Sequence, residues 1–278
     1  MDYKNTKVAI HIGLHKTGTT YLQNYVFPFL DNVCFARGYT ELRKVIRHNK
    51  SSLLISDERI SGNPFIGDYL EQFYNNMGNV KSQYANPLII LGVRHPLSWL
   101  HSAYMQYLKN GGVNNISYLF NPDHNAGALL KIEDLLFYNR IKYLKENFSN
   151  VIIYSQEMLK DNEALLLREI SKYLGDIVLN KKARVIDKRK ANVSLSEMRE
   201  VATLRKLNSI NDKSIILKKI MHSRVFKKIK LQPYELAKNK IVSEVLQVAK
   251  FSFEVYPDAI IDALDQDYNL CKKHIIRH

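Results

Sequence analysis

Residues 7–23 read KVAIHIGLHKTGTTYLQ, which predicts an apolar strand, a turn bounded by Gly13 and Gly18, and an amphipathic helix that begins at once. A strand that runs through such a turn into a helix points several backbone N–H groups at one place, together with the positive end of the helix dipole. The sequence therefore predicts an anion site at this turn, of the kind that phosphate usually occupies.

The position of the lysine separates this turn from those of ATPases and GTPases. The glycine spacing matches the G-x-x-x-x-G of the P-loop, but the Walker pattern has a lysine directly after the second glycine, where this chain has Thr19. The lysine here is Lys16, inside the turn, and it is followed by Thr17, Gly18, Thr19 and Thr20. This variant resembles the 5′-phosphosulfate loop (K-x-G-T-T) of the sulfotransferases, which use the nucleotide sulfate donor PAPS and release PAP.

A second segment resembles the same family. Residues 87–104, PLIILGVRHPLSWLHSAY, predict a buried strand that ends at Arg94 and a helix that begins near Pro96. An arginine at the carboxyl end of a strand in an open α/β sheet lies at the ligand crevice, and its planar guanidinium suits a terminal phosphate. The resemblance places Arg94, and Ser102 about two helical turns further on, at the site of the nucleotide 3′-phosphate.

Two weaker matches follow along the chain. Residues 151–159 and the predicted helix up to Gly175 resemble a structural segment of the family, in which Glu157 is architectural rather than catalytic. Residues 188–194, KRKANVS, resemble the basic loop that closes over the nucleotide, with Arg189 and Lys190 as binding residues. The resemblance spans approximately residues 7 to 195 and favours the bacterial, carbohydrate-type branch.

The resemblance also implies the chemistry. Sulfuryl transfer to a hydroxyl proceeds in line, with negative charge growing on the phosphate oxygen that leaves, and Lys16 is placed to neutralise that charge. Backbone N–H groups of the loop, with Thr17, Thr19 and Thr20, would hold the 5′-phosphate. His15 and Gly18 belong to the same binding loop. No metal is expected in this arrangement.

The acceptor hydroxyl needs a base, for which we predict Glu58. Residues 52–61, SLLISDERIS, predict a strand whose carboxyl end presents Asp57 and Glu58 at the mouth of the crevice. Family members that act on glycans commonly use a glutamate there, whereas the small-molecule branch uses a histidine. His101, beside Ser102, is the rival candidate. The glutamate favours a saccharide hydroxyl as acceptor.

The element pattern predicts an α/β fold with three layers, α/β/α, and a mainly parallel central sheet. Predicted strands alternate with predicted helices, and the chain is helical from about residue 195. We expect one domain over residues 1–278, with a nucleotide-binding core (1–195) and a basic helical extension packed on it (196–278). The strands are expected near 7–12, 52–57, 88–93 and 150–154, and the helices near 18–30, 64–77, 96–110, 133–147 and 161–174.

Composition is typical of an intracellular enzyme. The chain has 278 residues, of which 46% are hydrophobic and 24% charged, enough for one large core. No apolar run approaches the ~18 residues needed to span a bilayer, and the N-terminal residues do not resemble a signal peptide. Cys34 and Cys271 have neither metal-site nor disulfide-framework spacing. These features predict a soluble, cytoplasmic protein.

Positive charge is concentrated in one segment. The net charge is +14, and residues 181–230 hold 16 Lys or Arg against four acidic residues. This basic segment is either a solvated helical face or a surface for an anionic partner, such as a polyanionic acceptor or an acidic membrane. Nucleic acid is disfavoured because aromatic residues are sparse there.

Two other functions remain open at this point. A P-loop kinase or NTPase would use ATP and Mg²⁺, with Asp57 as a metal ligand after a degenerate Walker B strand, but the chain lacks Gly-Lys-[Ser/Thr]. A non-catalytic nucleotide-binding module with a basic partner-binding face would keep Arg94 and Ser102 but would not need Lys16 or Glu58.

Overall fold

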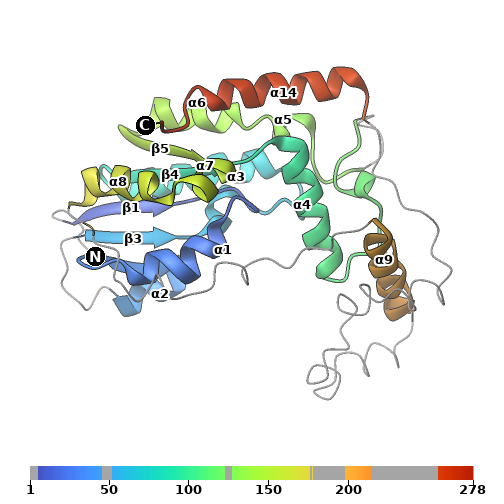
Figure 1. The fold of residues 1–278 in the computed structure, drawn as a ribbon, viewed down its shortest axis with the longest axis horizontal. Helices are drawn as coiled ribbons and strands as arrows, with labels where there is room; N and C mark the ends of the chain where they lie inside the picture. Colours follow the sequence, from blue (N-terminus) through green and yellow to red (C-terminus); the bar gives the residue numbers. More distant parts are fainter. Residues whose placement is uncertain are drawn as a thin grey trace, which may run out of the picture.

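A computed structural model describes residues 6–45, 52–122, 127–175, 177, 198–213 and 256–277. Its centre is a five-stranded sheet in which every pair of neighbouring strands is parallel (Figure 1). The order is β2-β3-β1-β4-β5, so the chain changes direction across the sheet at β1. The strands are β1 (Lys7–His11), β2 (Cys34–Arg37), β3 (Ser52–Ser56), β4 (Leu88–Val93) and β5 (Asn150–Ser155). The predicted α/β class and the four predicted strands are confirmed.

The central strands are almost entirely buried because helices cover both faces of the sheet. Every residue of β3 and β4 is buried, which explains their nearly continuous apolar sequences. Successive side chains of a strand point to opposite faces. In β1, Val8 and Ile10 therefore join one apolar cluster and Ala9 the other.

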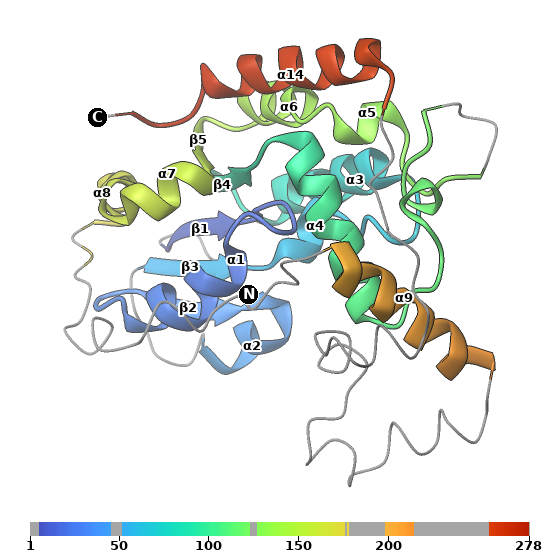
Figure 2. The same ribbon diagram turned by 45° about the vertical axis from the view of Figure 1, so that its right-hand side comes forward.

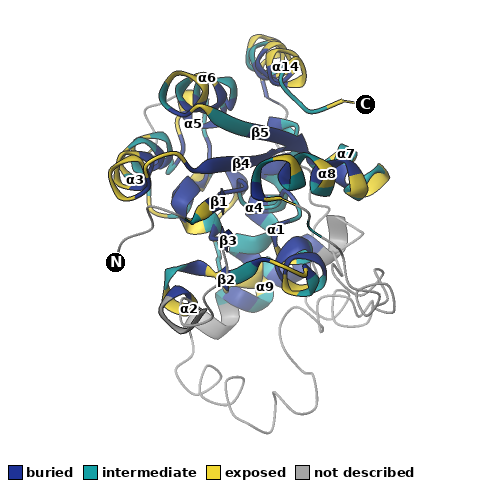
Figure 3. Cartoon of the chain, turned by 90° about the vertical axis from the view of Figure 1, so that its left-hand side faces the viewer, coloured by how far each residue is buried: buried dark blue, intermediate teal, exposed yellow. Residues whose placement is uncertain are grey.

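The helices form the two outer layers (Figure 3). One layer packs on the face of the sheet to which Ala9 points. It contains α1 (Thr19–Tyr21), η1 (Leu22–Val26), η2 (Phe27–Phe29), α7 (Gln156–Asp161) and α8 (Glu163–Leu174). The opposite layer contains α3 (Tyr69–Gln83), α4 (Pro96–Lys109), α5 (Ile132–Leu135), α6 (Tyr138–Asn147) and α14 (Asp258–Lys272). The short turns η4 (Glu58–Ser61) and η5 (Ile116–Tyr118) connect elements of this layer.

Several predicted boundaries were wrong. The edge strand β2 and α2 (Gly38–Val45), which packs on it, were not predicted. The predicted first helix is a short α-helix continued by a π turn and a 3₁₀ turn that contains Pro28, and α3 begins at Tyr69 rather than near residue 64. The helix predicted over 133–147 is divided into α5 and α6.

The C-terminal helix α14 packs on α4 and α6 (Figure 2). Its Asp267 accepts a hydrogen bond from the backbone N–H of Tyr138 at 3.1 Å. After the helix ends, Ile276 donates its N–H to the carbonyl of Ile153, so this segment lies along the outer edge of β5.

Helix α9 (Met198–Lys213) lies across α4, where the Asn208 side chain donates to the carbonyls of Leu108 and Gly112. Arg189, Lys190 and most of the basic segment 181–230 lie outside the described residues. Among the described helices, none is long and apolar enough to cross a membrane. Cys34 and Cys271 are free thiols.

Candidate functional site

The turn after β1 lies at the carboxyl edge of the sheet and is fixed to β4. Leu14 donates its N–H to the carbonyl of Gly92, and Thr17 Oγ1 donates to the carbonyl of Leu14 at 2.6 Å. Lys16 and Gly18 have positive φ angles of 68° and 96°. A lysine rarely adopts this left-handed conformation, and such residues concentrate at functional sites.

Lys16, in the turn after β1, is influenced by charged residues that follow β3 and β4. Burial lowers the pKa of its ammonium group, nearby Glu58 raises it, and Arg94 lowers it. Its Nζ donates to Gln106 Oε1 on α4 at 3.4 Å. The carboxylate after β3 and the guanidinium after β4 therefore both act on the same lysine, as the parallel order of these strands predicts.

Glu58 faces the binding turn. Its Oε1 lies 3.7 Å from His15 Nδ1, while His15 Nε2 donates to the carbonyl of Gly62 at 2.9 Å. The neighbouring Arg59 does not neutralise Glu58, because it forms a two-pronged ion pair with Asp57 at 2.8 and 2.7 Å. The Glu58 side chain remains 35% exposed, so a substrate can reach it.

Arg94 is half-buried on the other side of Lys16. Burial lowers the pKa of its guanidinium, while Glu157 and Tyr268 raise it. Tyr268 on α14 donates to Glu157 Oε2 at 3.0 Å. Within the described parts of the chain, Arg94 forms no hydrogen bond or ion pair, although it is partly removed from water. A guanidinium in that condition suits an anionic ligand.

The remaining predicted residues on α4 lie close to Arg94. Burial lowers the pKa of His101, and Arg94 lowers it further, which keeps the imidazole neutral. Ser102, the next residue, is also half-buried. His95 is used differently: its Nε2 lies 2.7 Å from Asp265 Oδ1 on α14, which makes it a structural contact.

The threonines of the turn have different surroundings. Thr19 is buried, with its hydroxyl next to that of Tyr154, whereas Thr20 is exposed. The Thr17 hydroxyl hydrogen is used within the turn. The first backbone N–H groups of the helix that begins at Thr19 suit a phosphate group.

A buried polar network supports the turn from below, and sequence reasoning missed it. His11 forms two hydrogen bonds. Its Nδ1 lies 2.7 Å from Ser56 Oγ, and its Nε2 lies 2.9 Å from the Tyr154 hydroxyl oxygen. Gln23 also donates to Ser56 Oγ. A side chain at Gly92 would approach the Tyr154 ring to 2.4 Å, so glycine is required there by close packing. In the sequence, the feature that could have indicated this network is a histidine, His11, at the end of an apolar strand.

This network predicts acid sensitivity. Burial lowers the pKa of His11 from 6.5 to about 3. The unfolded chain therefore binds a proton that the folded chain excludes, and stability falls as the pH drops from 6.5 towards 3. Lowering the pH from 7 to 4.5 should therefore reduce the free energy of unfolding by about 2–3 kcal/mol through this histidine alone.

Urea denaturation at both pH values measures the effect, with His11→Gln as the comparison. The wild-type protein should lose about 2–3 kcal/mol more than the variant over this range. Equal pH dependence of the two proteins would show that His11 takes up a proton in the folded state.

No protein-family model and no curated protein matches the sequence. Among solved structures, a sulfotransferase from Alicyclobacillus acidocaldarius has 12% sequence identity and a TM-score of 0.46, over 73% of this chain and 92% of that chain. The mouse sulfotransferase SULT7A1, complexed with PAP, has 15% identity and a TM-score of 0.41, over 69% of this chain and 65% of that chain. Likeness at this level carries no functional argument.

Proposed function

We propose that the protein is a sulfotransferase that uses PAPS. The observation that supports this most is Lys16 itself, which the turn after β1 holds in a left-handed conformation, with Glu58 3.7 Å from the adjacent His15. PAPS supplies an activated sulfuryl group that passes to a hydroxyl, with PAP as the other product.

The chain offers separate groups for the two ends of the nucleotide. Thr19, Thr20 and the N–H groups of the turn would hold the 5′-phosphate, and Arg94 with Ser102 the 3′-phosphate. The exposed hydroxyl of Thr20 and the half-buried guanidinium of Arg94 fit these roles. Arg189 and Lys190 are proposed to contribute from the segment outside the described residues.

Lys16 and Glu58 divide the chemistry. The Lys16 ammonium would stabilise negative charge as it develops on the leaving phosphate oxygen. Glu58 would accept the proton of the acceptor hydroxyl, and its partly exposed carboxylate can receive it. His101, neutral through burial and the nearby Arg94, is the alternative base.

The contacts of Asp57 argue against the kinase or NTPase alternative. Both carboxylate oxygens accept hydrogen bonds from Arg59, and one also accepts from the Arg59 backbone N–H. An aspartate that binds Mg²⁺ needs at least one oxygen directed at the metal. Within the described residues, no group of three His, Cys, Asp or Glu side chains is placed to hold a metal ion.

We propose a saccharide as the acceptor, in line with a glutamate base. The basic segment 181–230 would then contact an anionic acceptor or an acidic membrane surface. Both proposals depend on sequence: the glutamate at position 58 and the excess of Lys and Arg.

Nucleotide binding tests the proposed function. PAP should bind without metal and much more tightly than AMP, from which it differs only by the 3′-phosphate. Arg94→Ala should weaken PAP by about 1.5–3 kcal/mol, or roughly 10- to 150-fold in Kd, and leave AMP nearly unchanged.

Calorimetry with PAP, AMP and ATP plus Mg²⁺ makes the measurement. Arg168→Ala is the matched control, because Arg168 is an exposed arginine on α8. Mg²⁺-dependent binding of ATP without preference for the 3′-phosphate would refute the sulfotransferase proposal.

A further inference from the structure

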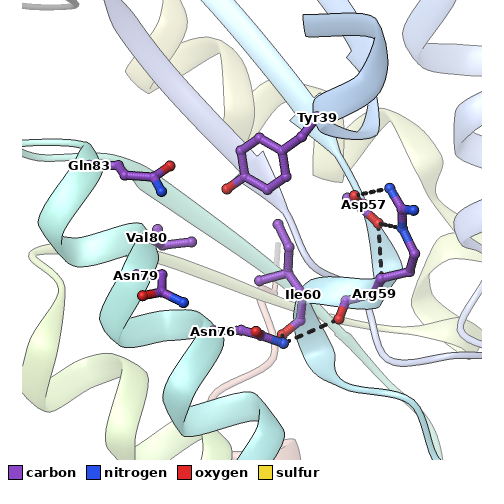
Figure 4. Close-up of a pocket in the computed structure, with 8 residues that line it drawn as sticks. All are labelled: Tyr39, Asp57, Arg59, Ile60, Asn76, Asn79, Val80 and Gln83. Atoms are coloured by element: carbon purple, nitrogen blue, oxygen red, sulfur yellow. Dashed lines mark hydrogen bonds and ion pairs between the residues drawn. The ribbon is translucent and has the colours of Figure 1, made fainter.

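A cavity of about 410 Å³ is lined by Asp57 and Arg59, the two residues that flank the proposed base in the chain (Figure 4). It lies between α2, the residues that follow β3, and the outer face of α3. Its volume is within the ~300–1,000 Å³ typical of small-molecule sites. None of the residues that line it belongs to the proposed nucleotide site.

One wall is a stripe of carboxamides on α3. Asn76, Asn79 and Gln83 recur at helical spacing, so they lie on one face together with Val80. Asn76 has a structural use, since it donates to the carbonyls of Arg59 and Ile60. The side chains of Asn79 and Gln83 form no hydrogen bond with another described residue, and a carboxamide offers both donors and an acceptor.

The opposite wall is polar and carries no excess positive charge. The Arg59 guanidinium is paired at 2.7 Å with the Asp57 carboxylate, and Glu58 adds a second negative charge next to this pair. A free phosphate or sulfate would meet no uncompensated positive charge here. Arg59 uses Nε and Nη2 for Asp57, and its guanidinium lies on the far side of this carboxylate from Tyr39 and Val80 (Figure 4).

The cavity also has apolar surfaces. Tyr39 points its ring and hydroxyl across the cavity towards Val80 on α3, and Ile60 lies below the ring (Figure 4). A saccharide ring matches this mixture of polar and apolar walls. Its hydroxyl groups need hydrogen-bond donors and acceptors, and its C–H faces pack on apolar and aromatic side chains.

We propose that this cavity binds an uncharged saccharide ring, the part of the acceptor remote from the reacting hydroxyl. This assignment rests on the proposed function, since Glu58 lies between Asp57 and Arg59 in the chain and faces Lys16 and His15. A saccharide of more than one ring would then extend from the cavity to the base. The cavity selects a neutral ring, whatever charge the rest of the acceptor carries.

A glycan array probed with PAP-saturated protein tests the proposal. The double variant Asn79→Ala/Gln83→Ala should lose at least about tenfold in binding to neutral oligosaccharides. Both positions are exposed on a helix, where alanine is well tolerated, so the variant should fold. Asn75→Ala is the matched control, because Asn75 is exposed on the same helix but does not line the cavity.

Calorimetry with PAP on the same samples separates the two proposals. Unchanged PAP affinity, with saccharide binding lost only in the double variant, supports the cavity. If PAP binds but no glycan does, or the double variant binds glycans like wild type, the saccharide cavity is refuted and the sulfotransferase proposal stands. A preference for glycans only when the cavity-bound ring is sulfated or phosphorylated would also refute it. Saccharide binding without PAP binding would refute the proposed function and leave the cavity.

Discussion

Glu58→Gln is expected to lower kcat by about 10²–10⁴-fold, the usual contribution of a positioned base. Glutamine keeps the size and hydrogen-bonding capacity of the side chain but cannot accept the acceptor proton. PAP affinity should stay within about twofold, because the Glu58 carboxylate is proposed to contact the acceptor proton rather than the nucleotide. Single-turnover transfer from labelled PAPS to a saccharide acceptor measures the rate.

The control for this experiment is Glu71→Gln, which removes an exposed carboxylate from α3. It should transfer sulfate at the wild-type rate. His101→Gln separates the rival base: an active Glu58→Gln together with an inactive His101→Gln would assign the proton to the histidine. The sulfotransferase proposal would survive that outcome, but the saccharide acceptor would lose its main support.

Lys16→Met is expected to lower kcat by about 10²–10³-fold, which is the usual effect of removing one group that stabilises charge in the transition state. Methionine retains the apolar stem of the side chain and removes only the ammonium. Because the charge on the leaving oxygen is greatest in the transition state, turnover should suffer far more than PAP binding. The same single-turnover and calorimetric measurements give both quantities.

Lys142→Met is the matched control, since Lys142 is an exposed lysine on α6 that pairs only weakly with Glu146 at 4.0 Å. It should leave rate and affinity unchanged. If Lys16→Met weakened PAP binding strongly and turned over normally at saturation, Lys16 would be a binding residue and the proposed division between Lys16 and Arg94 would be wrong.

The sequence predicted the parts of the fold that depend on local pattern. The strands β1, β3, β4 and β5 are continuous apolar runs followed by turn residues, so their parallel order also predicted that Lys16, Glu58 and Arg94 meet at one edge. Strand β2 was missed because its four residues, CFAR, carry little apolar pattern and pair with a single neighbour.

The contacts that support the site could not be predicted in the same way. His11 meets Tyr154 across 143 positions of sequence, and Lys16 meets Gln106 across 90. Such pairs depend on side-chain packing between layers rather than on local periodicity. The cavity lined by Asp57 and Arg59 could not be predicted from the sequence either. One of its walls is α2, and the sequence does not indicate this helix unless β2 has been recognised first.

The position of α14 has a consequence for the order of synthesis. Tyr268 holds Glu157 beside Arg94, and Asp265 holds His95, so the surroundings of the proposed 3′-phosphate site include a helix near the C-terminal end of the described chain. The turn around Lys16 is translated near the start. During translation, the turn and Arg94 are therefore both made well before α14, and a nascent chain that lacks α14 has the proposed phosphate contacts without the helix that holds Glu157 beside Arg94.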